Sequence, residues 1–187
     1  FNITAVLGAG SDSLSIAGNE LGGNVPSIDF GAGVDSLILL GGSQNQDDDY
    51  EGVVTGTLER LTSDGNVLMA TLGSEAARAG LNPIDTTPGG SDIELDVTFV
   101  NDVSFTLGAN DDVIDASAAA GAMTFNVVEG NTDASDDISG GSSANDRFLI
   151  TSSGAAGDDF SNVDGVENFE VIGSPSNDVG MIFSNGS

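Results

Sequence analysis

A short unit of glycine and aspartate occurs twice in nearly identical form. Residues 8–14 have the sequence GAGSDSL and residues 31–37 have the sequence GAGVDSL, while residues 108–114 form a looser copy. Glycine permits tight left-handed turns, and aspartate supplies a hard carboxylate oxygen of the kind that Ca²⁺ binds. The apolar residue two positions after the aspartate is expected to begin a strand. The unit therefore predicts a calcium-binding turn, completed by backbone carbonyls near Gly8, Gly10, Gly31 and Gly33.

Weaker copies of the unit continue toward the C-terminus. One aspartate per copy gives positions 12, 35, 112, 136 and 159, and inside each cluster the step is 23 or 24. A step of this size predicts one coil of a β-solenoid per copy. The alternative is the plain turn role that Asp and Asn fill in many β-proteins. The candidate calcium ligands in these turns are Asp12, Asp35, Asp111, Asp112, Asp136, Asp137, Asp146, Asp158 and Asp159.

A second acidic cluster lies at residues 47–52, with the sequence DDDYEG. Asp47, Asp49 and Glu51 have the spacing that begins an EF-hand loop. The twelfth position is Leu58, where that loop requires a bidentate Glu. These three residues are further candidate ligands, and the alternative is a solvated acidic loop.

Strands are expected along most of the chain. Apolar and polar residues alternate over 93–99 and 103–107, the period of a half-buried strand. Two runs, 53–61 and 67–72, flank the turn sequence SDGN at 63–66 and predict a β-hairpin. Shorter apolar runs predict further strands at 125–128, 148–151, 169–172 and 181–183.

Helix is expected in one place. Ser74 precedes Glu-Ala-Ala-Arg-Ala and Gly80 follows it, which predicts one short helix ended before Pro83. Residues 115–121 predict a single turn.

The expected fold is all-β. It consists of β-solenoid or β-roll-like segments at 1–40 and 92–187, with the hairpin and the helix in an insertion at 41–91. All three segments could form one domain, and a β-sandwich is the alternative fold.

The charge is extreme. Thirty acidic residues face three basic ones, Arg60, Arg78 and Arg147, so the net charge is −27. Such a chain repels itself unless cations neutralise it, and its repeated apolar runs argue against disorder. The scarcity of bases argues against nucleic acid as a partner, since binding a phosphate backbone relies on Lys and Arg. No apolar stretch approaches the roughly 18 residues needed to cross a bilayer, so direct membrane insertion is not expected.

Most catalytic sites lack their essential residues. The chain has no His, Cys or Lys, which leaves no Ser-His or Cys-His pair, no P-loop lysine and no thiolate metal site. A pair of carboxylates could still form a glycosidase site. However, the chain has one Tyr and no Trp to line a sugar site. The protein is therefore not expected to be an enzyme.

The repeated units resemble the RTX (hemolysin-type) calcium-binding repeats, and in particular the S-layer proteins of Gram-negative bacteria. The resemblance rests on residues 8–14, 31–37 and 108–114, together with 114–118 and 163–171. It covers about half of the chain, and it departs from the family because tandem nine-residue repeats are missing. It implies Ca²⁺ as cofactor and a secreted, cell-surface location.

The expected function is structural, as a calcium-dependent subunit of an S-layer or surface filament. The partner is then a second copy of the chain, joined through sheet edges such as residues 1–7, unless these residues pair within their own sheet. Cell-surface polysaccharide is a further candidate partner. The alternatives are an RTX-type module of a larger secreted adhesin or hydrolase, and a polysaccharide-acting enzyme on a solenoid.

Overall fold

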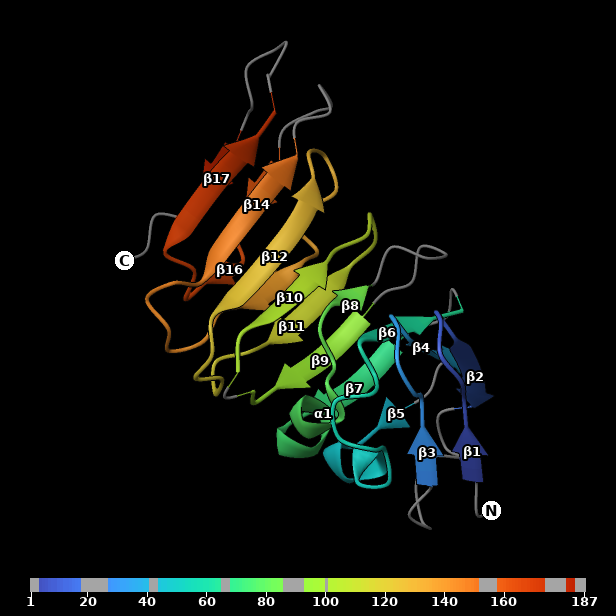
Figure 1. Ribbon diagram of the computed structural model, residues 1–187. Helices are drawn as coiled ribbons and strands as arrows, with labels where there is room; N and C mark the ends of the chain where they lie inside the picture. The colour runs from blue at the N-terminus through green and yellow to red at the C-terminus, as the bar shows by residue number, and fades with distance from the viewer. Residues whose placement is uncertain are drawn as a thin grey trace.

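The protein is a parallel β-solenoid of about 6 turns with one short α-helix (Figure 1). The structure is a computed structural model, and it describes residues 4–17, 27–40, 44–64, 68–85, 93–99, 101–151, 158–173 and 181–183. Every strand pair among these residues is parallel. The expected solenoid is confirmed. The alternative of a β-sandwich is wrong, since sandwiches are built from antiparallel sheets.

Two long sheets form the walls of the solenoid. The strands of the eight-stranded sheet are β2 (Ser13–Ala17), β4 (Ser36–Leu40), β6 (Arg60–Ser63), β8 (Ile84–Asp85), β10 (Val103–Thr106), β12 (Met123–Val128), β14 (Arg147–Thr151) and β17 (Asn168–Ile172). The strands of the six-stranded sheet are β5 (Gln44–Asn45), β7 (Leu68–Leu72), β9 (Ile93–Val97), β11 (Asp112–Asp115), β13 (Asp137–Ser139) and β16 (Val163–Asp164). In each sheet, neighbouring strands come from successive coils of the chain.

Two shorter sheets flank these walls. One pairs β1 (Thr4–Val6) with β3 (Ser27–Asp29), and the other pairs β15 (Asp158–Phe160) with β18 (Met181–Phe183). Residues 4–6 thus pair within their own chain, as in the alternative to joining a second copy through this segment. Residues 1–3 lie outside the described part.

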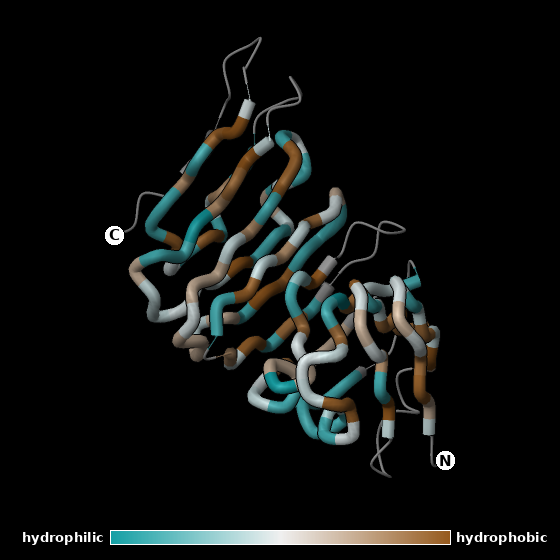
Figure 2. The backbone as a smooth tube through the Cα atoms, viewed as in Figure 1, coloured by the Kyte–Doolittle hydropathy of each residue, from teal (hydrophilic) through white to brown (hydrophobic). Residues whose placement is uncertain are grey.

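The inward side chains of the eight-stranded sheet form one continuous ladder. Register pairing connects Leu14, Leu37, Leu61, Ile84, Phe105, Phe125, Phe148 and Phe169. The sequence step from one member to the next is not constant and varies between 20 and 24. Apolar and polar positions alternate along these strands (Figure 2), because successive side chains of a strand point to opposite faces.

Aromatic rings occupy the C-terminal half of this ladder. The ring centroids of Phe105 and Phe125 are 5.2 Å apart, those of Phe125 and Phe148 are 5.0 Å apart, and those of Phe148 and Phe169 are 5.4 Å apart. Phe160 packs edge-on against Phe148 and Phe169. Stacked pairs of this kind add to the free energy gained by burying the rings.

The expected hairpin is wrong. Strand β6 pairs with β4 and β8, whereas β7 pairs with β5 and β9, so the two runs lie in different sheets. A turn sequence reverses a chain in a hairpin but also turns a corner between two walls, and alternation alone does not distinguish the two. Residues 53–59 form no strand beyond an isolated bridge at Val53, and residues 65–67 lie outside the described part.

The expected helix is confirmed as α1 (Ser74–Ala79). Gly80 follows it with φ of +107°, the left-handed conformation that glycine adopts at helix ends. A turn occurs at 117–118, within the expected single turn. Among the described residues, no helix has the length and apolar character that a bilayer crossing requires.

Replacing Phe125 by Ala should lower the free energy of unfolding by about 3–5 kcal/mol. This ring is fully buried and stacks on both neighbours, so its loss leaves a cavity and removes two ring pairs. The change is measured by urea denaturation, with Phe125→Leu as the matched control. A Phe125→Leu variant as stable as the natural chain would show that ring stacking adds nothing beyond apolar burial.

Candidate cation-binding site

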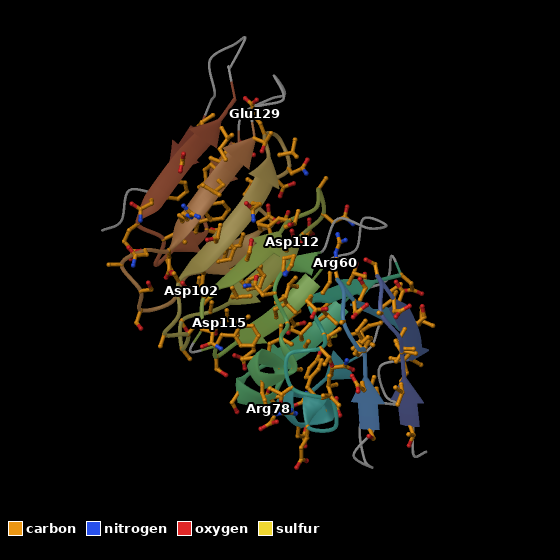
Figure 3. The ribbon with its side chains drawn as sticks, in the orientation of Figure 1. Arg60, Arg78, Asp102, Asp112, Asp115 and Glu129 are labelled. Atoms are coloured by element: carbon orange, nitrogen blue, oxygen red, sulfur yellow. The ribbon has the colours of Figure 1, made fainter. Side chains whose placement is uncertain are left out.

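Acidic residues stand at the entrance to most strands of the eight-stranded sheet. The residue directly before the strand is acidic in six of the eight cases, and we call these six residues the carboxylate column: Asp12, Asp35, Glu59, Asp102, Asp146 and Glu167. Strands β8 and β12 are preceded by Pro83 and Ala122 instead. Asp102 lies at this edge of the sheet in Figure 3. Strands in a sheet are about 4.8 Å apart, so the column places like charges in adjacent coils.

The first three members are linked by hydrogen bonds between coils. The backbone N–H of Asp12 donates to Oδ1 of Asp35 at 2.7 Å, and the N–H of Asp35 donates to Oε2 of Glu59 at 2.9 Å. The N–H of Gly8 donates to Oδ2 of Asp12 within the same turn, at 3.1 Å. Each of these carboxylates therefore fixes a turn of backbone, and the links to Asp35 and Glu59 join neighbouring coils.

Asp35 is the least solvated member of this trio. Its exposed fraction is 0%, and its Oδ2 atom has no hydrogen-bond partner among the described residues. A buried carboxylate oxygen without a donor costs free energy that a partner would recover. A hard cation is one kind of partner that would satisfy such an oxygen.

The glycines of the repeated unit let the turns stack closely. Gly31 has φ of +89°, and a Cβ atom built on it would lie 1.9 Å from the carbonyl oxygen of Gly8. The N–H of Gly10 donates to the carbonyl of Ala32 at 2.8 Å, and the N–H of Ala32 donates to the carbonyl of Gly8 at 3.2 Å. The Gly8 carbonyl, expected to assist calcium binding, therefore accepts a hydrogen bond from the next coil.

The same arrangement recurs in the later coils. Oδ1 of Asp136 accepts the N–H of Asp112 at 2.8 Å, and its Oδ2 accepts the N–H of Asp133 at 2.7 Å. Oδ1 of Asp146 accepts the N–H of Met123 at 2.7 Å, and its Oδ2 accepts the N–H of Gly141 at 2.8 Å. In both, one oxygen binds the previous coil and the other binds its own turn.

The structure separates the members of each Asp-Asp pair. Asp112, Asp136 and Asp158 are buried, whereas their neighbours Asp111 and Asp137 are exposed and Asp159 is partly exposed. Asp146 is buried and Asp12 is partly exposed. The candidate ligands of the Gly-Asp turns thus divide into buried carboxylates and carboxylates that are partly or fully exposed.

The acidic cluster at 47–52 forms the 3-10 helix η2 (Asp47–Tyr50), which packs beside α1. Oδ1 of Asp47 accepts the N–H groups of Gly73 at 2.8 Å and Ala76 at 2.9 Å, and therefore caps the N-terminus of α1. Oδ2 of Asp49 accepts the N–H of Gln46 at 2.8 Å, whereas the Glu51 side chain is exposed. The three candidate ligands of this cluster therefore have different environments.

Arg78 holds η2 and the following loop against α1. Its guanidinium donates to the carbonyls of Tyr50 at 2.9 Å, Glu51 at 2.8 Å and Val53 at 2.9 Å, and it pairs with Glu75 at 2.6 Å. One of the few cations in the chain is therefore committed to backbone carbonyls, and it leaves most of the acidic charge unpaired.

No protein-family model, curated protein or solved structure matches this chain. The likeness to RTX repeats and S-layer proteins therefore rests on the repeated units alone. The observed molecule is a β-solenoid with buried aspartates.

No three acidic side chains of the described ranges converge on one point. The predicted ligands are instead distributed one or two to a coil. Sequence reasoning missed Glu59, although its distance from Asp35 along the chain continues the same step. It was missed because no glycine unit precedes it and because Glu replaces Asp.

Burial changes the proton affinity of several carboxylates. It raises the pKa of Asp49, Asp136 and Asp158 above the ordinary value of 3.8. The Ser117 hydroxyl and N–H, both donating to Asp115, hold the pKa of that exposed carboxyl below its ordinary value.

An open groove of about 870 Å³ crosses the outer face of β10, β12, β14 and β17. Amide and hydroxyl groups dominate its lining, which also includes the basic residue Arg147 and the acidic residues Asp102 and Glu170. The other polar lining residues include Ser104, Thr124, Asn126, Asn145 and Asn168. The Nε of Arg147 donates to Thr124 at 3.3 Å. The groove offers many hydrogen-bonding groups and few apolar ones.

Replacing Asp47 by Ala should lower the free energy of unfolding by about 1–2 kcal/mol. The change leaves the first N–H groups of α1 without their acceptor. Asp48→Ala is the matched control, since Asp48 is the exposed neighbour in the same 3-10 helix. Equal stability of the two variants in urea denaturation would contradict the capping role.

Lowering the pH from 7.5 toward about 5 in chelator should raise the melting temperature. The folded state binds protons more tightly than the unfolded state at Asp49, Asp136 and Asp158, whose pKa values are raised. Stability is therefore gained as pH falls through these values. Below 3.8 the lowered pKa of Asp115 acts in the opposite direction.

Repulsion among all the acidic groups also weakens at low pH and would likewise raise the melting temperature. A high salt concentration distinguishes this contribution from that of the three buried groups. In roughly 1 M NaCl the Debye length falls to about 3 Å, so repulsion between exposed charges is screened. The rise in melting temperature that comes from the buried groups should remain. A melting temperature independent of pH in high salt would contradict the assignment to these buried groups.

Proposed function

We propose that this chain is a secreted, calcium-dependent structural protein of the cell surface, a subunit of an S-layer or a surface filament. The observation that carries the proposal is Asp35, a fully buried carboxylate with one unpartnered oxygen. It is linked to Asp12 and Glu59 in a chain of net charge −27. Calcium is the cation that such hard oxygen ligands favour.

Calcium has two tasks in this proposal. Within a subunit it neutralises carboxylates that the fold stacks in successive coils, which offsets their mutual repulsion. Because it binds the folded chain and not the unfolded one, it also stabilises the fold by mass action.

Self-association follows from the ends of the solenoid. Strands β2 and β17 are the outer strands of the eight-stranded sheet, and an outer strand offers unpaired backbone groups to another chain. Ile172 in β17 has 44% of its surface exposed. A parallel edge that meets the opposite edge of a second copy makes a heterologous contact, which repeats into a filament or lattice. Calcium between the anionic subunits reduces their repulsion.

Cell-surface polysaccharide is the proposed second partner, and the polar groove over β10–β17 is the surface that suits it. Its hydroxyl and amide groups match the hydrogen-bonding groups of a sugar chain. None of the described lining residues of the groove is aromatic, so hydrogen bonds rather than ring stacking would hold a sugar chain there. The chain has no His, Cys or Lys to act as nucleophile, base or Schiff-base lysine. A binding role therefore suits this surface better than catalysis.

The alternative is an RTX-type calcium-binding module of a larger secreted adhesin or hydrolase. The same buried carboxylates support it, since calcium would order the module without joining copies of it. Assembly distinguishes the two functions.

Removal of calcium should lower the melting temperature by at least about 5 °C, and millimolar CaCl₂ should induce assembly measured by light scattering. Asp35→Asn should lose part of the calcium-dependent rise in melting temperature. Asp164→Asn removes an exposed charge of the six-stranded sheet and serves as the matched control. NaCl at equal ionic strength controls for general screening.

Two outcomes would contradict the proposal. If the melting temperature is the same in chelator and in CaCl₂, calcium has no role in the fold. If calcium stabilises a chain that stays monomeric at all concentrations, the module function is correct and the subunit function is wrong.

A further inference from the structure

A buried polar corner lies where β12 ends, far along the chain from the two glycine units. Glu129 follows β12 directly, and the turn 129–132 meets Asp158, the first residue of β15. Figure 3 places Glu129 at the end of β12, away from α1 and η2. Glu129 and Thr132 belong to none of the glycine-aspartate units.

Asp158 is held inside this turn by one of its two carboxylate oxygens. Oδ1 accepts the N–H of Gly130 at 2.9 Å and the N–H of Thr132 at 3.3 Å. The N–H of Asp159 donates to the carbonyl of Thr132 at 3.0 Å, which joins the two segments a second time. The position of the carboxylate is therefore fixed by backbone on both sides.

Two further oxygens in this corner have no partner. Oδ2 of Asp158 and Oγ1 of Thr132 are buried, and neither makes a hydrogen bond with any residue that the structure describes. Asp158 is 0% exposed and Thr132 is 3% exposed. A buried polar atom left without a partner destabilises the folded state, and here the two such atoms belong to residues joined by a hydrogen bond.

Glu129 adds a second carboxylate to the same corner. It is 3% exposed, and its charge acts on Asp158, whose pKa is raised mainly by burial and further by Glu129. Two carboxylates taken out of water and set near each other repel strongly, because the protein interior screens charge poorly. A cation in this corner would remove the repulsion and supply the missing partner of the Asp158 and Thr132 oxygens.

We propose that the Glu129–Asp158 corner is a binding site for one Ca²⁺ ion, with Oδ2 of Asp158, Oγ1 of Thr132 and the Glu129 carboxylate as ligands. All three are hard oxygen donors, the class that Ca²⁺ selects. The ion ties the end of β12 to the start of β15, two segments about one coil apart in sequence. This inference rests on the calcium dependence proposed above and assigns part of it to residues outside the repeated units.

The test is the calcium stoichiometry of the whole chain, measured by isothermal titration with CaCl₂ at pH 7.5. Glu129→Gln removes the negative charge of one ligand, and Thr132→Val removes the hydroxyl oxygen of another. Both substitutions keep the side-chain shape and the backbone donors. Each should bind one Ca²⁺ fewer than the natural chain, or bind one at least about 10-fold more weakly, and each should show a smaller rise in melting temperature on adding CaCl₂. Glu170→Gln changes an exposed acid of β17 and is the matched control.

The outcomes distinguish this site from the proposed function. Unchanged stoichiometry in both variants, with far-ultraviolet circular dichroism like that of the natural chain, overturns the site. So does a Glu129→Gln variant that is more stable in chelator and equally responsive to calcium, since the corner then holds a proton. If the two variants each bind one Ca²⁺ fewer than the natural chain, but the natural chain never assembles, the site stands and the subunit function fails. If calcium-driven assembly depends on Asp35 while the two variants bind as much Ca²⁺ as Glu170→Gln, the subunit function stands and the Glu129–Asp158 site fails.

Discussion

The hydrogen bond from a backbone N–H of one coil to a carboxylate of the next is the interaction on which this solenoid depends. Sheet pairing joins the coils along their strands, and backbone bonds such as that from Gly10 to Ala32 join some of the turns. Asp35, Glu59, Asp136 and Asp146 accept N–H groups from the preceding coil and so extend coil-to-coil bonding into the turns. Charge-assisted bonds of this kind are stronger than bonds between neutral groups.

This interaction also creates the main electrostatic problem of the molecule. Turns that use a carboxylate in most coils stack negative charges at the spacing of the strands, and the chain has only three bases to oppose thirty acids. Arg78 is held by backbone carbonyls and by Glu75 rather than by the carboxylate column. The backbone donors compensate part of the repulsion. The remainder favours an environment rich in cations.

Regular features of the fold could be predicted from the sequence. The constant step between the aspartates of a cluster indicated the coil, and the alternation at 93–97 and 103–106 indicated strands, because both patterns follow from local geometry. The placement of β6 and β7 in different sheets could not be foreseen, since it depends on which strands pair with each of them.

The roles of individual carboxylates were harder to predict than the coil. Asp47 caps a helix that begins more than one coil later in the sequence, so no local pattern indicates its role. Which aspartate of an Asp-Asp pair is buried depends on the phase of the strand that follows: Asp112 begins β11, whereas Asp136 precedes β13. Glu59 and Glu129 lack the glycine unit and were recognised only from their place in the coil.

The variable length of the coils has a consequence for the evolution of the molecule. The inward ladder keeps its register although the sequence step between successive members is not constant, so the corners absorb each gain or loss of residues. The helix and η2 occupy such corners without interrupting either wall. Insertions at corners, and duplication of whole coils, are therefore changes that selection can accept, whereas a single deletion within a strand would turn its core side chains toward solvent.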